Sequence, residues 1–421
     1  MRHILFVDDD RDLLDGMRDA LRPRRREWRM TFVTSGEAAL SVFAREPVDI
    51  LVSDLRMPGM DGAALLAKVA HLQPDTVRIV LSGYANPETI GRVAAVAHRI
   101  LVKPSPIEDV TRVIERSCVL LDVTGEVQLI RAAAGACALP SPSETYSELT
   151  TLLADSETTT EQVAAVLERD IALSAKVLQL VNSEYFAPRQ PVSGLFDAVT
   201  LLGYDTVRAL VLSAEAFQKF DPTASIPGFS LDTLQRRSQH VGHLAHKLSQ
   251  GDPEADAALA AGLLLDVGLL VLAAHEPDYL ADVLVATTSE GRPMHEIEFD
   301  RKGITHAEIG AHLLALWGLP HTIVEAVAHH HRPLRSPIPS FDTVAVAHIA
   351  DALIAGTEAG AAGVPPTLTR LDGDYIERIG MTDRIAEWQR LATLELPPHE
   401  PQPERATTSS GPARPAPHGV R

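Results

Sequence analysis

The 421-residue chain has few cysteines, few aromatic residues and a shortage of basic residues. Its two cysteines, Cys118 and Cys137, form neither a CxxC motif nor a zinc-binding spacing, so we expect thiols in a reducing compartment rather than a disulfide framework. Lysine and arginine number 38 against 56 aspartates and glutamates, which gives a formal net charge of −18. This balance argues against a general nucleic-acid-binding protein, because cationic side chains supply most of the non-specific affinity for phosphate.

The chain also lacks a secretory signal and a long uninterrupted apolar segment. No basic region followed by an apolar stretch opens the sequence, and the longest apolar run, residues 257–274, carries Asp266 near its middle. An acid at the centre of a bilayer is costly, so this run favours a buried core helix over a membrane span. With 45% apolar and 22% charged residues, the composition is that of a globular protein. We therefore expect a cytoplasmic protein of two or three domains with no membrane contact.

Residues 1–120 alternate short β-type runs with amphipathic helical windows. The expected strands are Ile4–Val7, Met30–Val33, Ile50–Ser53, Ile79–Leu81 and Ile100–Val102. Five strand–helix units in succession predict an α/β fold with a doubly wound parallel sheet and helices on both of its faces.

Polar side chains stand at the ends of these strands. Asp8 and Asp9 follow the first strand, Asp54 the third, Ser82 the fourth and Lys103 the fifth. The carboxyl ends of parallel strands meet at one edge of a sheet, so we expect these residues to converge there. Crowded carboxylates repel one another and favour a hard cation such as Mg²⁺. A carboxylate beside Mg²⁺, with an ammonium and a hydroxyl group nearby, is suited to accept a phosphoryl group.

Residues 1–120 resemble the receiver domain of two-component response regulators. The resemblance rests on four motifs, which are ILFVDDD at 4–10, DILVSDLRMPGMDG at 49–62, VLSGYA at 80–85 and LVKP at 101–104. It implies a flavodoxin-like fold, a sensor histidine kinase as partner and phosphorylation of Asp54. It also implies Mg²⁺ held by Asp8, Asp9 and Asp54, and phosphoryl sensing by Ser82 and Lys103. Dimerisation near the fourth helix and fifth strand is compatible with the same resemblance.

One position departs from the receiver pattern. The family usually has an aromatic residue three positions before the lysine, and this chain has Ile100 there. The resemblance therefore implies the phosphorylation chemistry but leaves open how phosphorylation is transmitted.

The hydrophobic pattern of the sequence changes at residue 139. Up to about residue 394 there is almost no alternating pattern, and the windows 160–181, 198–217 and 306–317 have helical periodicity. This half is predicted to be all-α. It resembles the HDOD domain, an all-α relative of HD-type metal phosphohydrolases. The similar segments include LPSPSETYSELTTLL at 139–153, ERDIALSAKVLQLVNSEYF at 168–186, DAVTLLGYDTVRALVL at 197–212, AAGLLLDVGLLVL at 260–272, THAEIGAHLLALWGLPHTIVEAVAHHHRP at 305–333 and AVAHIADAL at 345–353.

The HDOD resemblance raises the question of a metal site. Imidazole and carboxylate ligands together suit Fe, Mn or Zn, whose bound hydroxide attacks phosphodiesters. The corresponding residues here are His240, Asp266, His306, His330, His331 and Asp351. Leu265 precedes Asp266 where HD enzymes have a histidine, and leucine cannot bind a metal. We therefore expect a degenerate site and a non-catalytic interaction domain with an unidentified protein partner. The alternative is a metal-dependent phosphodiesterase controlled by the receiver.

These observations predict the organisation of the chain. A receiver domain spans 1–120, a helical linker 121–138, an HDOD domain 139–360, a helical extension 361–396 and a disordered tail 397–421, which holds seven prolines. Residues 1–120 contain 17 basic and 17 acidic residues, so residues 121–421 carry the whole net charge of −18. This acidity favours a protein over a nucleic acid as the partner of the helical half.

Overall fold

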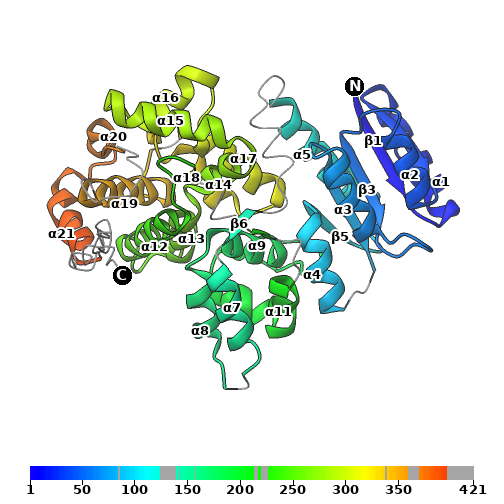
Figure 1. Ribbon diagram of the computed structural model, residues 1–421, viewed down its shortest axis with the longest axis horizontal. Coiled ribbons are helices and arrows are strands. Elements are labelled where there is room, and N and C mark those ends of the chain that lie inside the picture. The colour runs from blue at the N-terminus through cyan, green and yellow to red at the C-terminus, as the bar shows by residue number, and fades with distance from the viewer. Residues whose placement is uncertain are drawn as a thin grey trace, which may run out of the picture.

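The computed structural model describes the whole chain except residues 84–85, 124–138, 142, 156, 213–216, 220–225, 337–338, 359–368 and 396–421. Figure 1 shows two parts side by side, an α/β half (residues 1–123) and a larger helical half (residues 139–395). The predicted tail, most of the predicted linker and Cys137 lie outside the described residues.

The α/β half contains the predicted parallel sheet, with strand order β2-β1-β3-β4-β5. Its strands are β1 (Arg2–Val7), β2 (Trp28–Val33), β3 (Ile50–Asp54), β4 (Val77–Ser82) and β5 (Arg99–Val102). Each predicted strand falls inside an observed one. The sheet is flanked by α1 (Arg11–Ala20), α2 (Gly36–Phe43), α3 (Gly62–Leu72), α4 (Pro87–Val96) and α5 (Ile107–Val123), with a short 3₁₀ helix, η1 (Arg22–Arg26). The doubly wound fold is thus confirmed.

Short polar side chains begin the first four helices. The side chains of Asp10, Ser35, Asp61 and Asn86 each accept a hydrogen bond from a backbone N–H of the first turn. Such caps satisfy donors that have no partner within the helix. Each of these four residues ends the loop that follows a strand, and its cap fixes the position at which the next helix begins.

The helical half consists mainly of helices packed around one core. They are α7 (Ser143–Leu152), α8 (Thr160–Leu167), α9 (Ile171–Val181), α10 (Leu195–Leu202), α11 (Tyr204–Leu212), α12 (Leu231–Leu248), α13 (Ala255–Leu264), α14 (Val267–His275), α15 (Pro277–Glu290), α16 (Met294–Lys302), α17 (His306–Trp317), α18 (His321–His329), α19 (Thr343–Glu358), α20 (Gly373–Arg378) and α21 (Ile385–Glu395), with 3₁₀ turns η3 (Pro333–Arg335) and η4 (Thr382–Arg384). α21 packs against α12 and α19.

The prediction that this half is built of helices is confirmed, and the structure adds one short pair of strands. Two short strands, β6 (Leu139–Ser141) and β7 (Phe217–Lys219), pair in parallel. Three-residue strands are too short to show an alternating pattern. Two helical windows are also divided. The window 160–181 is divided into α8 and α9. Asp170 begins α9, because its carboxylate accepts hydrogen bonds from Ala172 N and Leu173 N. Gly203, with φ of 74°, separates α10 from α11.

The longest apolar run forms α13 and α14, which meet at Asp266. Residues 255–275 are long and apolar enough to cross a membrane, but 89% of their most apolar window is buried inside the protein. The prediction of a buried core helix agrees with this burial.

The two halves touch through the α4–β5 face of the α/β half. α4 packs against α11, and Figure 1 shows α4 between the sheet and the helical half. The surface proposed for dimerisation is therefore covered by the same chain. A homodimer would need another surface or a separation of the halves.

Candidate functional site

The carboxyl edge of the sheet brings together three charged side chains. Asp8 and Asp54 are buried, with 3% and 6% of their surface exposed, whereas Asp9 is exposed. Lys103 Nζ lies 2.7 Å from Asp8 Oδ2 and also contacts the Asp54 carboxylate. The predicted convergence of residues from β1, β3 and the end of β5 is thus present.

Backbone groups orient the two carboxylates. Arg56 N donates to Asp54 Oδ2 at 2.7 Å, and Asp10 N donates to Asp8 Oδ1 at 3.0 Å. Burial raises the pKa of Asp54, and Lys103 opposes that rise. Burial would lower the pKa of Lys103, but its contacts with Asp54 and Asp8 raise it. Lys103 therefore remains an ammonium ion that balances the two acids.

The predicted sensing residue Ser82 lies at the end of β4. It is buried, and its hydroxyl donates to Gly83 O at 2.9 Å. Lys103 N donates to Ser82 O at 2.7 Å, which ties the ends of β4 and β5 together, and the Lys103–Pro104 peptide bond is cis. Ile100, at the position where receivers usually have an aromatic residue, is buried.

The donor set at this edge suits Mg²⁺. Asp8, Asp9 and Asp54 offer only carboxylate oxygens, the ligands that Mg²⁺ prefers, and exposed Asp9 lies where waters can complete the coordination. These three residues would hold the ion.

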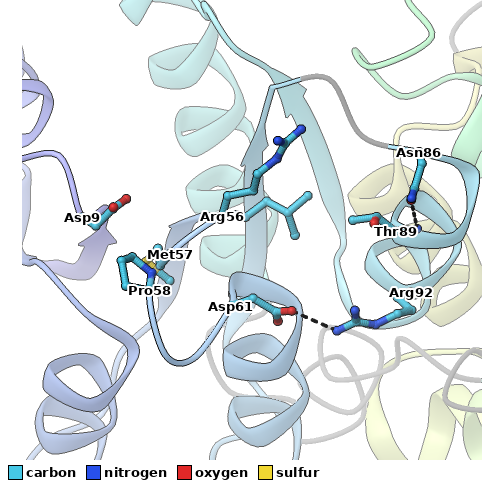
Figure 2. A pocket seen from close by; sticks show the side chains of 9 residues that line it. Asp9, Arg56, Met57, Pro58, Asp61, Asn86, Thr89 and Arg92 are labelled. Atoms are coloured by element: carbon cyan, nitrogen blue, oxygen red, sulfur yellow. Dashed lines mark hydrogen bonds and ion pairs between the residues drawn. The ribbon is translucent and has the colours of Figure 1, made fainter.

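An open cavity of about 710 Å³ adjoins the site. Figure 2 shows it between Asp9, the β3–α3 loop and the first turn of α4, with Arg56 and Arg92 on its walls. Asn86 caps α4 by accepting from Thr89 N at 2.8 Å. The cavity is lined by Leu55 and Arg56, which directly follow Asp54, and it has two guanidinium groups on its walls.

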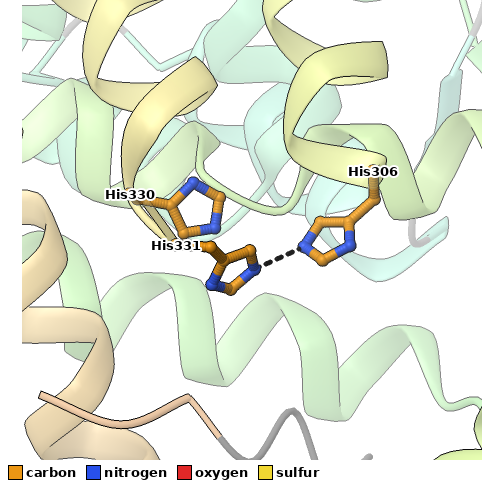
Figure 3. Close-up of side chains that lie close together, drawn as sticks. All are labelled: His306, His330 and His331. Atoms are coloured by element: carbon orange, nitrogen blue, oxygen red, sulfur yellow. Dashed lines mark hydrogen bonds between the residues drawn. The ribbon is translucent and has the colours of Figure 1, made fainter. Parts of the chain in front are cut away.

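A second cluster lies in the core of the helical half. Asp266, His306, His330, His331 and Asp351 converge from α14, α17, α18 and α19. His306 Nε2 is 3.4 Å from Asp266 Oδ1 and 3.0 Å from His331 Nε2. His331 Nδ1 is 3.9 Å from Asp351 Oδ2. Figure 3 shows the three histidines facing one another; their nearest donor atoms lie within 4.8 Å.

Two members of this cluster, Arg237 and Glu298, were missed in the sequence. Arg237 of α12 reaches the carboxylates. It pairs with Asp351, and its Nε is 3.8 Å from Asp266 Oδ2. Glu298 Oε2 lies 2.7 Å from His306 Nδ1. Arg237 is three residues before His240, and this spacing on a buried helix face was the available signal.

The electrostatics of the cluster follow from these contacts. Burial would lower the pKa of His306, but Glu298 and Asp266 raise it to about 10. Burial opposes ionisation of Asp266, but His306 and Arg237 hold the pKa of this carboxyl below its usual value. Burial and neighbouring histidines lower the pKa of His331 well below its usual value. Asp266 is thus an ion paired with two cations rather than a protonated acid.

The three histidines of this cluster could together hold a metal ion, but neighbouring groups compete with one. Both ring nitrogens of His306 lie near carboxylates, which raises its pKa and favours the protonated imidazole, a form that cannot bind a metal. Arg237 already supplies positive charge to Asp266 and Asp351. Leu265, at the position of the missing histidine, is 2% exposed. The cavity that borders His331 measures about 10 Å³, which is room for about one water molecule.

Comparison with known proteins gives two family matches. The model of the response regulator receiver domain matches residues 4–115, and that of the HDOD domain matches residues 139–333. Together they cover both halves.

Several individual proteins are similar over parts of the chain. An uncharacterized protein of Treponema pallidum is 27% identical over 195 residues, which are 44% of this chain and 37% of that protein. The hydrogenase transcriptional regulatory protein HoxA of Cupriavidus necator is 36% identical over 103 residues, 24% of this chain and 21% of HoxA. The chain thus spans about two fifths of the first relative and one fifth of the second.

Two further similarities cover most of the other protein. The response regulator receiver protein CpdR of Brucella abortus is 28% identical over 120 residues, 28% of this chain and 96% of CpdR. The crystal structure of the MmoQ response regulator of Methylococcus capsulatus has a TM-score of 0.44 and 22% identity, covering 60% of this chain and 98% of that structure.

Proposed function

We propose that this chain, which belongs to the response regulators that join a receiver domain to an HDOD domain, accepts a phosphoryl group on Asp54 and signals through protein contacts of its HDOD domain. The observation that carries the proposal is the buried Asp54 carboxylate at the end of β3, held by Lys103 beside Asp8, with a cavity of about 710 Å³ lined by the neighbouring residues Leu55 and Arg56. A sensor histidine kinase is the proposed donor, since receiver domains interact with such kinases, and the proposed location is the cytoplasm.

The chemistry is an in-line phosphoryl transfer. An Asp54 oxygen attacks the phosphorus, a new P–O bond forms, and the bond to imidazole of the kinase, or to acetate of a small donor, breaks. Mg²⁺ held by Asp8, Asp9 and Asp54 would neutralise part of the charge on the transferred group. Lys103 supplies a second positive charge, and Ser82 must leave Gly83 O to donate to the new phosphoryl oxygens.

The HDOD domain is proposed to act without catalysis. Arg237 and the His306 cation neutralise the carboxylates that a metal would need, and Leu265 replaces one ligand. The neighbouring cavity of about 10 Å³ leaves no room for a nucleotide. The HDOD domain is therefore proposed to signal by binding a protein partner, which its acidic composition favours over a nucleic acid.

Mass spectrometry tests the phosphoacceptor. The purified full chain is incubated with acetyl phosphate and Mg²⁺, and its intact mass is measured. We expect the wild type and Asp75→Ala, an exposed acid before β4, to gain one phosphoryl group, and Asp54→Ala to gain none. An unchanged wild-type mass would refute the proposal.

The second candidate is an HD-type phosphodiesterase, favoured by the three histidines whose donor atoms lie within 4.8 Å. Metal analysis of the purified protein and hydrolysis of bis-p-nitrophenyl phosphate test it. Stoichiometric Fe, Mn or Zn that disappears in His306→Ala would support this candidate and overturn the non-catalytic one.

A further inference from the structure

The contact between the two domains contains a fully buried lysine. Lys176 sits in α9, a helix whose residues are all buried, and is 0% exposed. Its Nζ donates to Ala94 O of α4 at 3.1 Å and to Gln179 Oε1 at 2.9 Å, and it lies 4.0 Å from the centre of the Trp317 ring. A charge buried in this way is costly unless polar groups and aromatic faces compensate it. One of these three partners, the Ala94 carbonyl, lies across the domain boundary.

Lys176 completes the C-terminus of α4. In a regular helix Ala94 O would accept from His98 N, but His98 N donates to Arg78 O of β4 instead. The Ala94 carbonyl, at the negative end of the helix dipole, receives the ammonium ion of the HDOD domain in its place.

Gln179 caps the two carbonyl groups that follow α4. Its Nε2 donates to Ala97 O and to His98 O, both at 3.1 Å. Together Lys176 and Gln179, one turn apart on α9, satisfy the carbonyls that lead from α4 into β5.

The receiver returns the same type of contact. Arg99, at the start of β5, is 9% exposed, and its Nη2 donates to Ala315 O in the last turn of α17 at 3.3 Å. Its Nη1 lies 4.0 Å from Glu184 Oε1 of the HDOD domain. Each domain therefore places a cation on the C-terminus of a helix of the other, which we term the reciprocal caps (Lys176 on α4, Arg99 on α17).

The helices under the caps are packed closely. A Cβ atom on Gly91 of α4 would lie 2.6 Å from the backbone carbonyl of Ala209 in α11. A residual cavity of about 10 Å³ between the domains is lined by Ile100, Gln179 and Trp317, among others. Little displacement of α4 is tolerated without loss of the caps.

We infer that the reciprocal caps hold the receiver closed on the HDOD domain, and that phosphorylation of Asp54 opens this interface. The inference rests on the proposed function and adds the element that transmits it. β5 has Arg99 at one end and leads into Lys103 at the other, and α4 begins five residues after Ser82. When Ser82 and Lys103 move toward a phosphoryl group, α4 and β5 move with them and the caps lose their geometry.

Linkage makes the inference reciprocal. If phosphoryl binding weakens the caps, loss of the caps must strengthen phosphoryl binding by the same factor. Beryllofluoride with Mg²⁺ serves as a non-covalent phosphoryl mimic, so an equilibrium constant can be measured.

Hydrogen–deuterium exchange of the full chain tests the opening. With beryllofluoride and Mg²⁺ we expect amides of α4, α9 and the end of α17 to exchange roughly ten-fold faster, within the usual range of coupled sites. Asp54→Ala should show no change. Beryllofluoride binding without faster exchange in these helices would overturn the inference and leave the proposed function intact, whereas no binding at all would refute the proposed function itself.

Cap variants test the coupling. Lys176→Met keeps the length of the side chain and removes the charge, and Lys68→Met, at an exposed position of α3, is the matched control. We expect Lys176→Met to bind beryllofluoride several-fold more tightly and Lys68→Met to bind as the wild type does. Arg99→Met provides the same test from the receiver side if Lys176→Met does not fold. Equal binding by a folded cap variant and the wild type would overturn the inference.

Discussion

Arg237 sets the charge balance in the core of the HDOD domain. It is 2% exposed and lies between Asp266 and Asp351, with the His306 cation on the far side of Asp266. A buried guanidinium group thus supplies positive charge to both carboxylates. The cluster is stable only as a set, because removing one partner leaves a buried charge without compensation.

Replacing Arg237 should therefore destabilise the protein strongly. We expect Arg237→Ala to lower the free energy of unfolding by about 3–5 kcal/mol, the usual cost of breaking a buried ion pair, measured by urea titration. Arg236→Ala, at an exposed position on the same helix, should change it by less than about 0.5 kcal/mol. Similar losses in both variants would contradict the assigned role.

A buried neutral histidine makes stability depend on pH. Burial lowers the pKa of His312 to about 4. Between pH 6.5 and 4 the unfolded chain binds a proton here that the folded chain does not, so stability falls as the pH falls, by up to about 3 kcal/mol. His312→Gln should lose less stability than the wild type between these pH values in urea titrations. His321→Gln, on an exposed side chain, should follow the wild-type curve.

At the level of helices, α4 and α11 meet where a side chain cannot fit. Gly91→Ala would place Cβ 2.6 Å from backbone atoms of Ala209, which cannot rotate away. We expect this variant to melt at a lower temperature than the wild type and to show faster exchange in α4 and α11. Gly16→Ala, in exposed α1 with no atom within 4 Å, should be stabilising by about 0.5–1 kcal/mol because alanine favours helices. Equal melting temperatures for the two variants would contradict the close contact.

The elements differ in how well the sequence predicts them. The five receiver strands were found because each has an apolar run between turn residues, and their polar ends identified Asp8, Asp54 and Lys103. β6 and β7 were missed because LPS and FQK show no pattern, and their pairing depends on a partner 78 residues away.

The contacts between helices could not be predicted from short sequence windows. The position of Arg237 depends on the packing of α12 against α13 and α19, which no single window shows. One sequence feature indicates the domain interface, namely the basic residue Lys176 within the apolar segment IALSAKVLQLV. Such a charge has to be compensated from outside its own helix, but the sequence does not say by which residue.

At the scale of the whole molecule, the negative charge is concentrated in one half. Residues 121–421 hold 39 acidic and 21 basic residues, whereas residues 1–120 are formally neutral.

This distribution predicts the absence of non-specific DNA binding. We expect the full chain, with or without acetyl phosphate and Mg²⁺, to leave the mobility of a generic DNA duplex unchanged at low salt and micromolar protein, because few cations are available to neutralise phosphates. A mobility shift that disappears as salt is added would contradict this expectation.

The covalent connection between the domains lowers the affinity that their interface needs in order to stay closed. Because both domains belong to one chain, their facing surfaces meet at an effective concentration far above that of separate dilute fragments. An interface whose intrinsic dissociation constant is well below that concentration stays closed in the intact chain, yet the same surfaces would separate when the two domains are mixed as dilute fragments. Cleavage of the connection would therefore release the HDOD domain as effectively as a chemical signal, without altering a single contact residue.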